Sequence, residues 1–400
     1  MSRELQGEPQ HIDVDPYAVP VLESPYEFHR LLRDTAPVVM LERYGVYAVG
    51  RYSECGDVLT DFKRFESSGG IGIQDIRKPG KFRTPSKLIE VDPPEHTAVR
   101  SALNKILTPL AIRKWKADFE REAEAYVDRV ISMGEFDGVE DFAESYVMKV
   151  FANAVGVKLP RTETLAIGEM RFNQTGPENE LYRQSMVRAQ PYLAWFEEAR
   201  QRQNMVPGSI GEMLFDAEDR GEFPPGYAAN LLLTFVGGGT DSSISGICTV
   251  LRQLASQPDQ WNLLKADPSK ARTALDEGIR FDTPFQIVYR TVRQDTELSG
   301  FTLKQGMKIG AFLGAANRDP RKWPNPDSFD LARQTAGVHL AFGVASHVCI
   351  GQMIARLEAE SLLGALARRA KDLTLAGAPR YRPMNQLRTL DYLPLRVKGA

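Results

Sequence analysis

Phe342-Gly343-Val344-Ala345-Ser346-His347-Val348-Cys349-Ile350-Gly351 leads directly into the run Gln352-Met353-Ile354-Ala355-Arg356-Leu357-Glu358-Ala359-Glu360. Two glycines bracket a lone cysteine in a predicted loop, and the residues that follow favour an α-helix. Cys349 is therefore expected near a helix N-terminus, where backbone N–H groups favour a thiolate over a thiol. Such a thiolate can be a nucleophile, a redox sensor or a metal ligand, and its position alone does not choose among the three.

Two simpler interpretations of Cys349 explain less of this stretch. Most free cysteines are small buried hydrophobic residues, but that role does not explain the glycines, the aromatic residue and the histidine together. A closed zinc site needs four ligands. The chain has only Cys55, Cys248 and Cys349, contains no Cys-x-x-Cys, and offers only His347 close to Cys349.

Bulk composition describes an ordinary globular chain. Its 400 residues are 42% hydrophobic and 26% charged, with a formal net charge of −2, so no global bias toward nucleic acid or membranes is present. No apolar run approaches the roughly 18 residues of a membrane span. The first residues show neither a signal core nor a transit pattern, and the cysteines are few and scattered. We expect a cytoplasmic protein with a single domain over residues 1–400.

Periodicity predicts a mainly α-helical chain with small β-sheets. Residues 1–20 are expected to form an irregular arm, and residues 68–87 a long functional connection. The other expected elements are a helix at 26–33, a hairpin at 38–49, a helix from 51 with Ser53 as cap, a helix from 92 with Asp92 as cap, helix over 119–156, helical segments in 160–205, a long helix at 227–256, strands over 289–313, a helix after 351 and a β-like tail at 385–398.

The long helix contains a costly feature. Gly237, Gly238 and Gly239 stand in its middle, and each costs about 1 kcal/mol against alanine in a helix interior. A local widening that frees backbone groups for water or a ligand is the expected reason. Asp241 and Ser242 follow directly and form an acid–alcohol pair.

Five ordered motifs resemble the cytochrome P450 superfamily. They are Pro93-Pro94-x-His96-x-x-x-Arg100, Gly239-x-Asp241-Ser242, Glu277-x-x-Arg280, the segment Pro320–Arg333 and Phe342-Gly343-x-x-x-His347-x-Cys349-x-Gly351. The resemblance spans nearly the whole chain. It implies the cytochrome P450 fold, with a long central kinked helix over a haem b.

The resemblance also implies a role for each motif. Cys349 would be the axial ligand of the haem iron, in the loop that carries Phe342 and Gly343. The haem propionates would be bound by His96, Arg100, Arg290 and His347. Asp241 and Ser242 would deliver protons, with serine here in place of the commoner threonine, while Glu277, Arg280 and Arg333 would form a structural salt-bridge cluster. Electrons would come from a ferredoxin and its reductase, docking near Arg356, Arg368 and Arg369.

Several segments resemble bacterial P450s that oxidise para-substituted benzoates, including 4-methoxybenzoate. They are Arg83–Pro94, Gly176–Leu181 and Phe312–Arg321. The resemblance implies that Arg83, Ser86 and Thr234 hold the substrate carboxylate. It places Phe172, Thr175, Val288 and Gly238 around the ring, and Leu233 where some members have a second arginine. O-demethylation would hydroxylate the methyl group and release formaldehyde.

Three alternatives remain at this stage. A wider, less cationic pocket would suit neutral alkylguaiacols or other lignin-derived methoxyaromatics. A haem-free hydrolase would use Cys349 as nucleophile with His347 as base. A haem sensor or carrier would bind the cofactor without turnover, and would leave Asp241 and Ser242 without a task.

Overall fold

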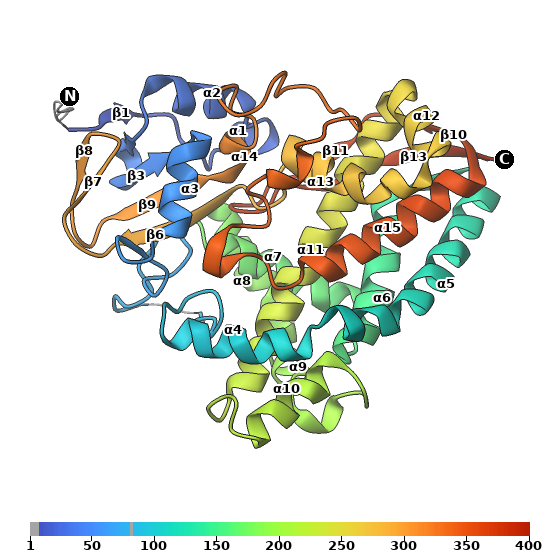
Figure 1. The fold of residues 1–400 in the computed structure, drawn as a ribbon, viewed down its shortest axis with the longest axis horizontal. Coiled ribbons are helices and arrows are strands. Elements are labelled where there is room, and N and C mark those ends of the chain that lie inside the picture. The colour runs from blue at the N-terminus through green and yellow to red at the C-terminus, as the bar shows by residue number, and fades with distance from the viewer. Residues whose placement is uncertain (1–7, 81–82) are drawn as a thin grey trace.

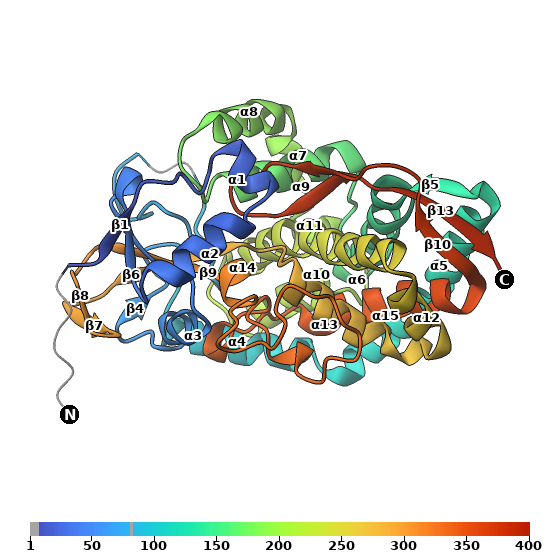
Figure 2. The same ribbon diagram turned by 90° about the horizontal axis from the view of Figure 1, so that it is seen from above.

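The computed structural model describes residues 8–80 and 83–400. A sheet-rich part lies at one end of the molecule and a helical part at the other, and the long helix α11 (Tyr227–Ser256) runs between them (Figures 1 and 2). No helix in the described ranges is long and apolar enough to span a bilayer.

The strands form small sheets. They are β1 (Gln10–Ile12), β2 (Val39–Leu41), β3 (Val46–Val49), β4 (Phe65–Glu66), β5 (Glu135–Asp137), β6 (Ile287–Val292), β7 (Thr296–Leu298), β8 (Phe301–Leu303), β9 (Lys308–Phe312), β10 (Ala370–Leu375), β11 (Arg380–Arg382), β12 (Thr389–Tyr392) and β13 (Pro394–Gly399). The largest sheet has the order β1-β2-β3-β9-β6-β4. Alternate residues of a strand share a face, so β6 presents Val288 and Arg290 on the same side.

The helices make up most of the chain. They are α1 (Val19–Glu23), α2 (Tyr26–Thr35), α3 (Tyr52–Thr60), α4 (Glu95–Ile106), α5 (Pro109–Met133), α6 (Ser145–Val155), α7 (Arg161–Asn173), α8 (Glu180–Ala189), α9 (Leu193–Ala199), α10 (Ile210–Asp219), α11, α12 (Pro258–Ala266), α13 (Ala271–Phe281), α14 (Leu313–Ala316) and α15 (Gln352–Arg369). A π-helix, Gly138–Glu144, precedes α6.

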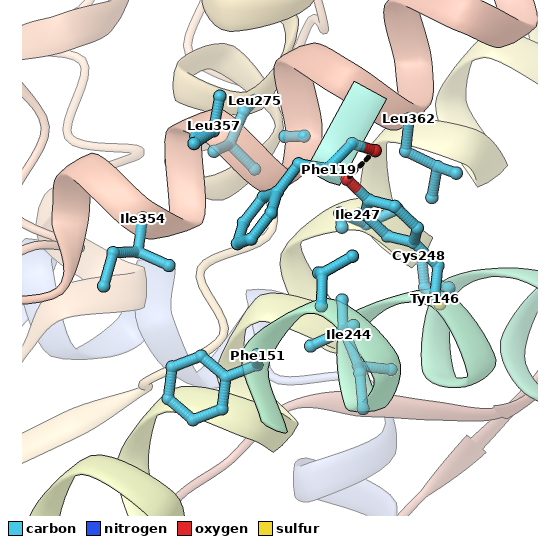
Figure 3. Close-up of a cluster of buried hydrophobic side chains, with 14 of the residues drawn as sticks. Phe119, Tyr146, Phe151, Ile244, Ile247, Cys248, Leu275, Ile354, Leu357 and Leu362 are labelled. Atoms are coloured by element: carbon cyan, nitrogen blue, oxygen red, sulfur yellow. Dashed lines mark hydrogen bonds between the residues drawn. The ribbon is translucent and has the colours of Figure 1, made fainter. Parts of the chain in front are cut away.

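Apolar side chains from the helical part form the main core. Phe119 of α5, Tyr146 of α6, Ile247 of α11 and Leu362 of α15 meet there (Figure 3), and all four are buried. The Tyr146 hydroxyl donates to the carbonyl of Phe119, 3.3 Å away, so its polar end is satisfied inside the core. This packing holds α11 and α15 in place on either side of the cavity described below.

The glycines of α11 have a different explanation from the one expected. α11 is continuous α-helix through residues 237–239, so the predicted widening is wrong. A Cβ at Gly237 would collide with Arg171, and one at Gly239 would lie 2.5 Å from the Phe151 ring, whereas Gly238 faces open space. Close approach of α6 and α7, together with an open cavity, therefore accounts for all three glycines.

Most element predictions are confirmed, and four need correction. Strand β1 and helix α1 give regular structure to part of the expected N-terminal arm, whose residues 1–7 lie outside the described ranges. β5 and the π-helix interrupt the helix predicted over 119–156. Neither expected cap is present. Ser53 lies inside α3 and donates to Glu54, and the Asp92 carboxylate accepts from the backbone of Ser67 and Ser68.

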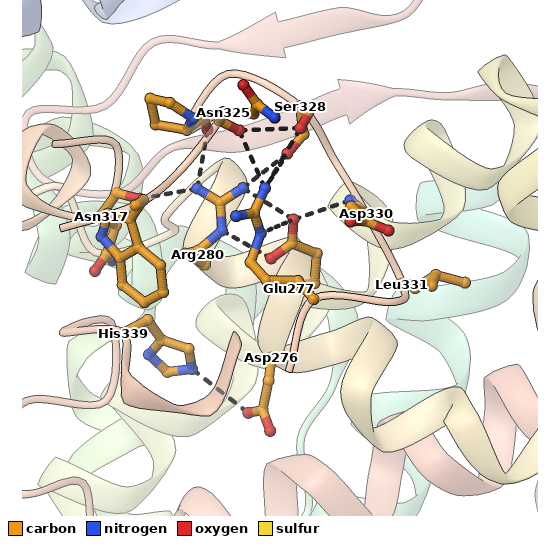
Figure 4. A network of polar contacts seen from close by, with 12 residues as sticks. Asp276, Glu277, Arg280, Asn317, Asn325, Ser328, Asp330, Leu331 and His339 are labelled. Atoms are coloured by element: carbon orange, nitrogen blue, oxygen red, sulfur yellow. Dashed lines mark hydrogen bonds and ion pairs between the residues drawn. The ribbon is translucent and has the colours of Figure 1, made fainter. Parts of the chain in front are cut away.

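A buried ionic cluster joins α13 to the segment 317–333 (Figure 4). The Glu277 carboxylate accepts from Arg280 Nε at 2.7 Å and from Arg333 Nε at 3.1 Å, and both Glu277 and Arg280 are fully buried. Arg280 Nη2 also donates to Glu277, and the terminal guanidinium nitrogens of both arginines donate to backbone carbonyls, those of Asn317, Pro324, Asn325, Pro326 and Ser328. Glu277 thus forms ion pairs with both Arg280 and Arg333, and the two arginines bind an irregular segment through its backbone carbonyls.

Removing the Glu277 carboxylate should destabilise the protein strongly. Glu277→Ala leaves two buried guanidinium groups without a counter-charge, which costs about 3–5 kcal/mol in comparable buried pairs. Glu360→Ala is the matched control, because Glu360 forms an exposed pair with Arg272 and such pairs contribute about 0–1 kcal/mol. Urea unfolding followed by tryptophan fluorescence measures both variants. Equal, small effects would contradict the assigned role.

Candidate active site

A cavity of about 260 Å³ lies between α11 and the cysteine loop. Thr234, Gly238, Gly239 and Ser242 of α11 line one side, and residues 341–344 and 347–351 line the other. Other lining residues are His96 and Arg100 of α4, Val288 and Arg290 of β6, and the apolar side chains of Ile71, Leu88, Ile89, Phe151 and Phe285. The cavity is therefore largely apolar, with polar groups confined to a few places.

Cys349 lies in this cavity, in a tightly turned loop. Its backbone N–H donates to the carbonyl of Phe342 at 2.7 Å, and Gly343 has a φ of +67°, a conformation that favours glycine. A Cβ at Gly351 would lie 3.9 Å from the Cys349 sulfur. The loop thus leaves the sulfur open to the cavity.

The thiol is not activated by its position alone. Burial is the largest influence and raises the pKa of Cys349, although the N–H of Gly351 and the charges of Arg100 and Arg356 lower it. The expectation that the helix N-terminus alone favours the thiolate is therefore wrong for the chain without metal. A metal ion coordinated by Cys349 would supply the missing charge, because a coordinating thiol is deprotonated outright.

Four basic side chains converge beside the cysteine loop. The rings of His96 and His347 lie 4.2 Å apart between centroids. Arg100 donates to the carbonyl of Val348 at 2.6 Å, and the buried Arg290 donates to the carbonyl of its neighbour Tyr289. Neither ring nitrogen of His96 has a hydrogen-bond partner among the described residues. Burial, followed by the charges of Arg290, His96 and Arg100, lowers the pKa of His347 to about 3.

Asp241 and Ser242 point in different directions, as consecutive helix residues do. Ser242 borders the cavity, and its hydroxyl donates to the Gly238 carbonyl at 2.6 Å. Asp241 packs against Gly168 of α7 and is buried. Burial raises the pKa of its carboxyl to about 7, while the charge of Arg382 lowers it. The carboxyl can therefore take up and release a proton near neutral pH.

The expected carboxylate-binding residues are close together, but their partners differ from the prediction. Ser86 Oγ and Thr234 Oγ1 lie 2.7 Å apart, and Thr234 lines the cavity. Arg83 forms a bidentate ion pair with the buried Glu90. Glu90 also accepts from the backbone of Ile71 and Ser86. Arg83 is thus already neutralised within the protein.

The predicted ring-binding residues divide into two groups. Val288 and Gly238 line the cavity as expected. Phe172 and Thr175 do not, because Phe172 packs with Met384 and Leu387 and the Thr175 hydroxyl bonds to the Phe172 carbonyl and to Gln386. Phe285 takes the aromatic place in the cavity wall, with its ring 5.7 Å from that of Phe172. No sequence signal distinguished Phe285 from a core phenylalanine.

A second group of ion-paired side chains holds the cysteine loop. It also removes one residue from the surface expected to bind the ferredoxin. Asp276 of α13 accepts from Arg356 of α15 at 2.9 Å and faces His339 at 3.4 Å. Arg356 is buried, and its guanidinium lies 4.7 Å from the centre of the Phe342 ring. It is therefore unavailable as a docking cation. Arg368 and Arg369, at the far end of α15, pair with acidic residues of α5.

Comparison with known proteins identifies the fold. Residues 271–371 match the family model described as Cytochrome P450. Over 392 residues the chain is 40% identical to "Cytochrome p450 CYP199A2" from Rhodopseudomonas palustris, a match that covers 98% of this chain and 95% of that relative. The chain belongs to the cytochrome P450 family.

Solved P450 structures share this architecture. The structure of P450 CYP109Q5 from Chondromyces apiculatus is 29% identical with a TM-score of 0.81, covering 97% of this chain and 99% of the other. Epothilone B-bound cytochrome P450epoK is 27% identical with a TM-score of 0.83, covering 97% and 100%. The protein is a cytochrome P450 monooxygenase, and the cofactor of this family is haem b.

The cavity of this P450 fits a haem. A sulfur faces it from the loop, apolar side chains cover its walls, and Gly238 and Gly239 remove side chains from the opposite side. Neither ring nitrogen of His96 has a hydrogen-bond partner among the described residues, and the buried Arg290 donates to the backbone carbonyl of its neighbour. Both side chains could therefore bind the two haem propionates, which need cationic or hydrogen-bonding partners.

Asp241 should make the stability of this P450 depend on pH. Its carboxyl has a pKa of about 7 in the folded chain against 3.8 ordinarily, so between these values only the unfolded chain releases the proton. Stability present below about pH 4 is therefore lost as pH rises toward 7. Relative to wild type, Asp241→Asn should gain roughly 1.4 kcal/mol per pH unit between about pH 5 and 6.5.

Urea unfolding of the holoenzymes at three pH values across that window measures this difference. Asp118→Asn, at an exposed position on α5, is the control for the substitution itself. A difference between Asp241→Asn and wild type that stays constant across the window would show that Asp241 is ionised in the folded chain.

Proposed function

We propose that this P450 oxidises small para-substituted aromatic acids, and that it O-demethylates 4-methoxybenzoate to the phenol with release of formaldehyde. The observation that carries the proposal is a pair of neighbouring hydroxyl groups at one place in a largely apolar cavity wall, where Thr234 lines the cavity and Ser86 lies 2.7 Å behind it. Hydroxyls can donate to a carboxylate, and the remaining walls suit an aromatic ring. The resemblance of three segments to benzoate-oxidising P450s supports the same substrate class.

Haem would be held by residues from both sides of the cavity. Cys349 is proposed as the axial iron ligand, in the loop shaped by Phe342 and Gly343. His96, Arg100, Arg290 and His347 are proposed to bind the propionates. When bound, haem supplies the activation of O2 that C–H oxidation requires. The protein orients the substrate methyl group toward it by anchoring the opposite end of the ring.

Asp241 and Ser242 are proposed to deliver protons from opposite faces of one helical turn. Ser242 holds its hydroxyl at the cavity surface, and Asp241 keeps a carboxyl that exchanges its proton near neutral pH. Ser242 lacks the β-methyl of threonine, and its hydroxyl is oriented here by the Gly238 carbonyl.

Electrons are proposed to come from a ferredoxin and its reductase, and the protein is proposed to be cytoplasmic. The docking surface proposed for the ferredoxin lies on the cysteine side of the molecule. It excludes Arg356, which is buried and paired with Asp276.

Neutral methoxyaromatics such as alkylguaiacols are the second candidate substrates. The Arg83–Glu90 ion pair favours them, because it removes the expected cation from the polar end. Leu233 also favours neutral substrates, because some of the benzoate-oxidising P450s have an arginine at this position.

A binding panel separates the two substrate classes. The ferric holoenzyme is titrated with 4-methoxybenzoate, 3-methoxybenzoate and 4-ethylguaiacol while the shift to high spin is recorded. The para acid should give the largest shift, and NADH-driven turnover with a ferredoxin system should release formaldehyde in step with O2 consumption. A shift with the guaiacol alone would refute the acid proposal, and binding without turnover would favour a sensor or carrier.

Thr234→Val should weaken acid binding selectively. It keeps the shape of the side chain but removes a hydroxyl, and a hydrogen bond to a charged group contributes roughly 1.5–3 kcal/mol. The Kd for 4-methoxybenzoate should therefore rise by about 10-fold or more, while that for 4-methoxytoluene stays nearly unchanged. Spectral titration of both ligands provides the comparison, and an equal change for the two would remove Thr234 from the carboxylate site.

A further inference from the structure

Arg171 of α7 differs from the neighbouring arginines of α8 and of the C-terminal end of α9. It is only partly exposed, yet across residues 8–80 and 83–400 its guanidinium has no hydrogen bond or ion pair. Arg183 and Arg188 of α8 pair with Glu180 and Glu169, and Arg200 pairs with Glu197. Arg171 is therefore a positive charge that no carboxylate in the described structure neutralises.

Close packing brings Arg171 against the central helix. Gly237 of α11 is so near that an added Cβ would collide with the Nε and Cδ atoms of Arg171. Gly237 follows Thr234 by three positions and precedes Gly238 by one, and residues three apart are neighbours on a helix surface. Thr234 and Gly238 both line the cavity. The Arg171 side chain therefore lies next to the face of α11 that carries Thr234 and lines the cavity.

The charges around Arg171 leave a surplus of one cation. The groups that act on it electrostatically are Arg83, Glu90 and Arg200. Arg83 and Glu90 neutralise each other in a bidentate pair. Arg200 pairs with Glu197 and also donates to the Ala229 carbonyl. Among the described residues, no carboxylate of α7, α9, α11 or the 83–90 segment forms an ion pair with Arg171.

A surplus charge in this position is costly for the protein alone. Burial lowers the pKa of Arg171 to about 10, so the group stays protonated at neutral pH. An incompletely solvated charge without a partner destabilises the fold unless a ligand neutralises it. A carboxylate matches the planar guanidinium, which can donate two parallel hydrogen bonds to it.

We propose that Arg171 determines the specificity of the cavity for anions, by supplying the positive charge for the carboxylate of an aromatic acid beside Thr234. This inference rests on the proposed function. It replaces Arg83, whose charge Glu90 already neutralises, as the principal cation of the site. Ser86 and Thr234 then orient the carboxylate, and Arg171 selects the acid over its neutral analogue.

The test compares an acid with a neutral analogue of nearly the same shape. Calorimetric titration of the ferric holoenzyme uses 4-methoxybenzoate and 4-methoxybenzyl alcohol with wild type, Arg171→Met, Arg171→Lys and the control Arg183→Met, which removes an exposed arginine of α8. Arg171→Met should raise the Kd for the acid by roughly 10- to 100-fold, the effect of a lost charged hydrogen bond. The Kd for the alcohol should change less than about threefold, and Arg171→Lys should recover part of the acid affinity.

Thermal unfolding supplies an independent readout. Without ligand, Arg171→Met should be at least as stable as wild type, because it removes an unpaired charge. Saturating 4-methoxybenzoate should raise the Tm of wild type and of Arg183→Met more than that of Arg171→Met. A purely structural arginine would instead lower the unliganded Tm and weaken both ligands equally.

Each outcome decides between the two proposals. Equal binding of the acid to wild type and Arg171→Met overturns the role of Arg171 and leaves the proposed function standing. Equal weakening of acid and alcohol also overturns it. Binding of the alcohol but of no acid by wild type overturns both proposals together.

Discussion

The buried carboxylate of Glu277 is the interaction on which the site most depends. It holds Arg280 and Arg333, and these arginines in turn bind the backbone carbonyls of a segment that has little regular structure of its own. Next to it on α13, Asp276 binds Arg356 of α15 and faces His339 at the start of the cysteine loop. One helix thereby fixes both the irregular segment and the loop. These contacts, together with the hydrogen bond from the Cys349 N–H to the Phe342 carbonyl, hold the loop that carries the Cys349 sulfur.

Uncompensated positive charge marks two places around the cavity. Near the cysteine loop, Arg100 and Arg290 form no ion pair among the described residues, and the two histidines beside them have pKa values lowered by burial, which fits a haem that carries its own negative groups. Beside α11, Arg171 is left over after Arg83 and Glu90 pair. Unpaired buried charges destabilise a protein alone, so both places point to anionic ligands. Cofactor and substrate would then complete the charge balance of the fold.

The glycines of α11 connect packing to function. Gly237 allows Arg171 to approach, Gly239 allows Phe151 to approach, and Gly238 leaves space in the cavity. The helix is packed closely at Gly237 and Gly239 and leaves open space at Gly238. It therefore gives the cavity a rigid wall without filling it. At Gly237 and Gly239, the roughly 1 kcal/mol cost of a glycine in a helix is offset by close contacts that no larger residue permits.

The sequence alone determined the family, and its motifs named the residues that we propose as the sulfur ligand and the propionate-binding groups, together with the ion-paired Glu277, Arg280 and Arg333. These features depend on local spacing along the chain, which motifs preserve. Only the tertiary structure decided the partners of individual charged and polar groups. It pairs Arg83 with Glu90 and buries Arg356 against Asp276. It also places Phe285 in the cavity wall and Thr175 outside it, and leaves Arg171 without an ion pair in the part of the chain that the structure describes. The physical reason is that the energy of a charge or hydroxyl depends on which groups the fold brings within a few ångströms, and those groups come from distant parts of the chain.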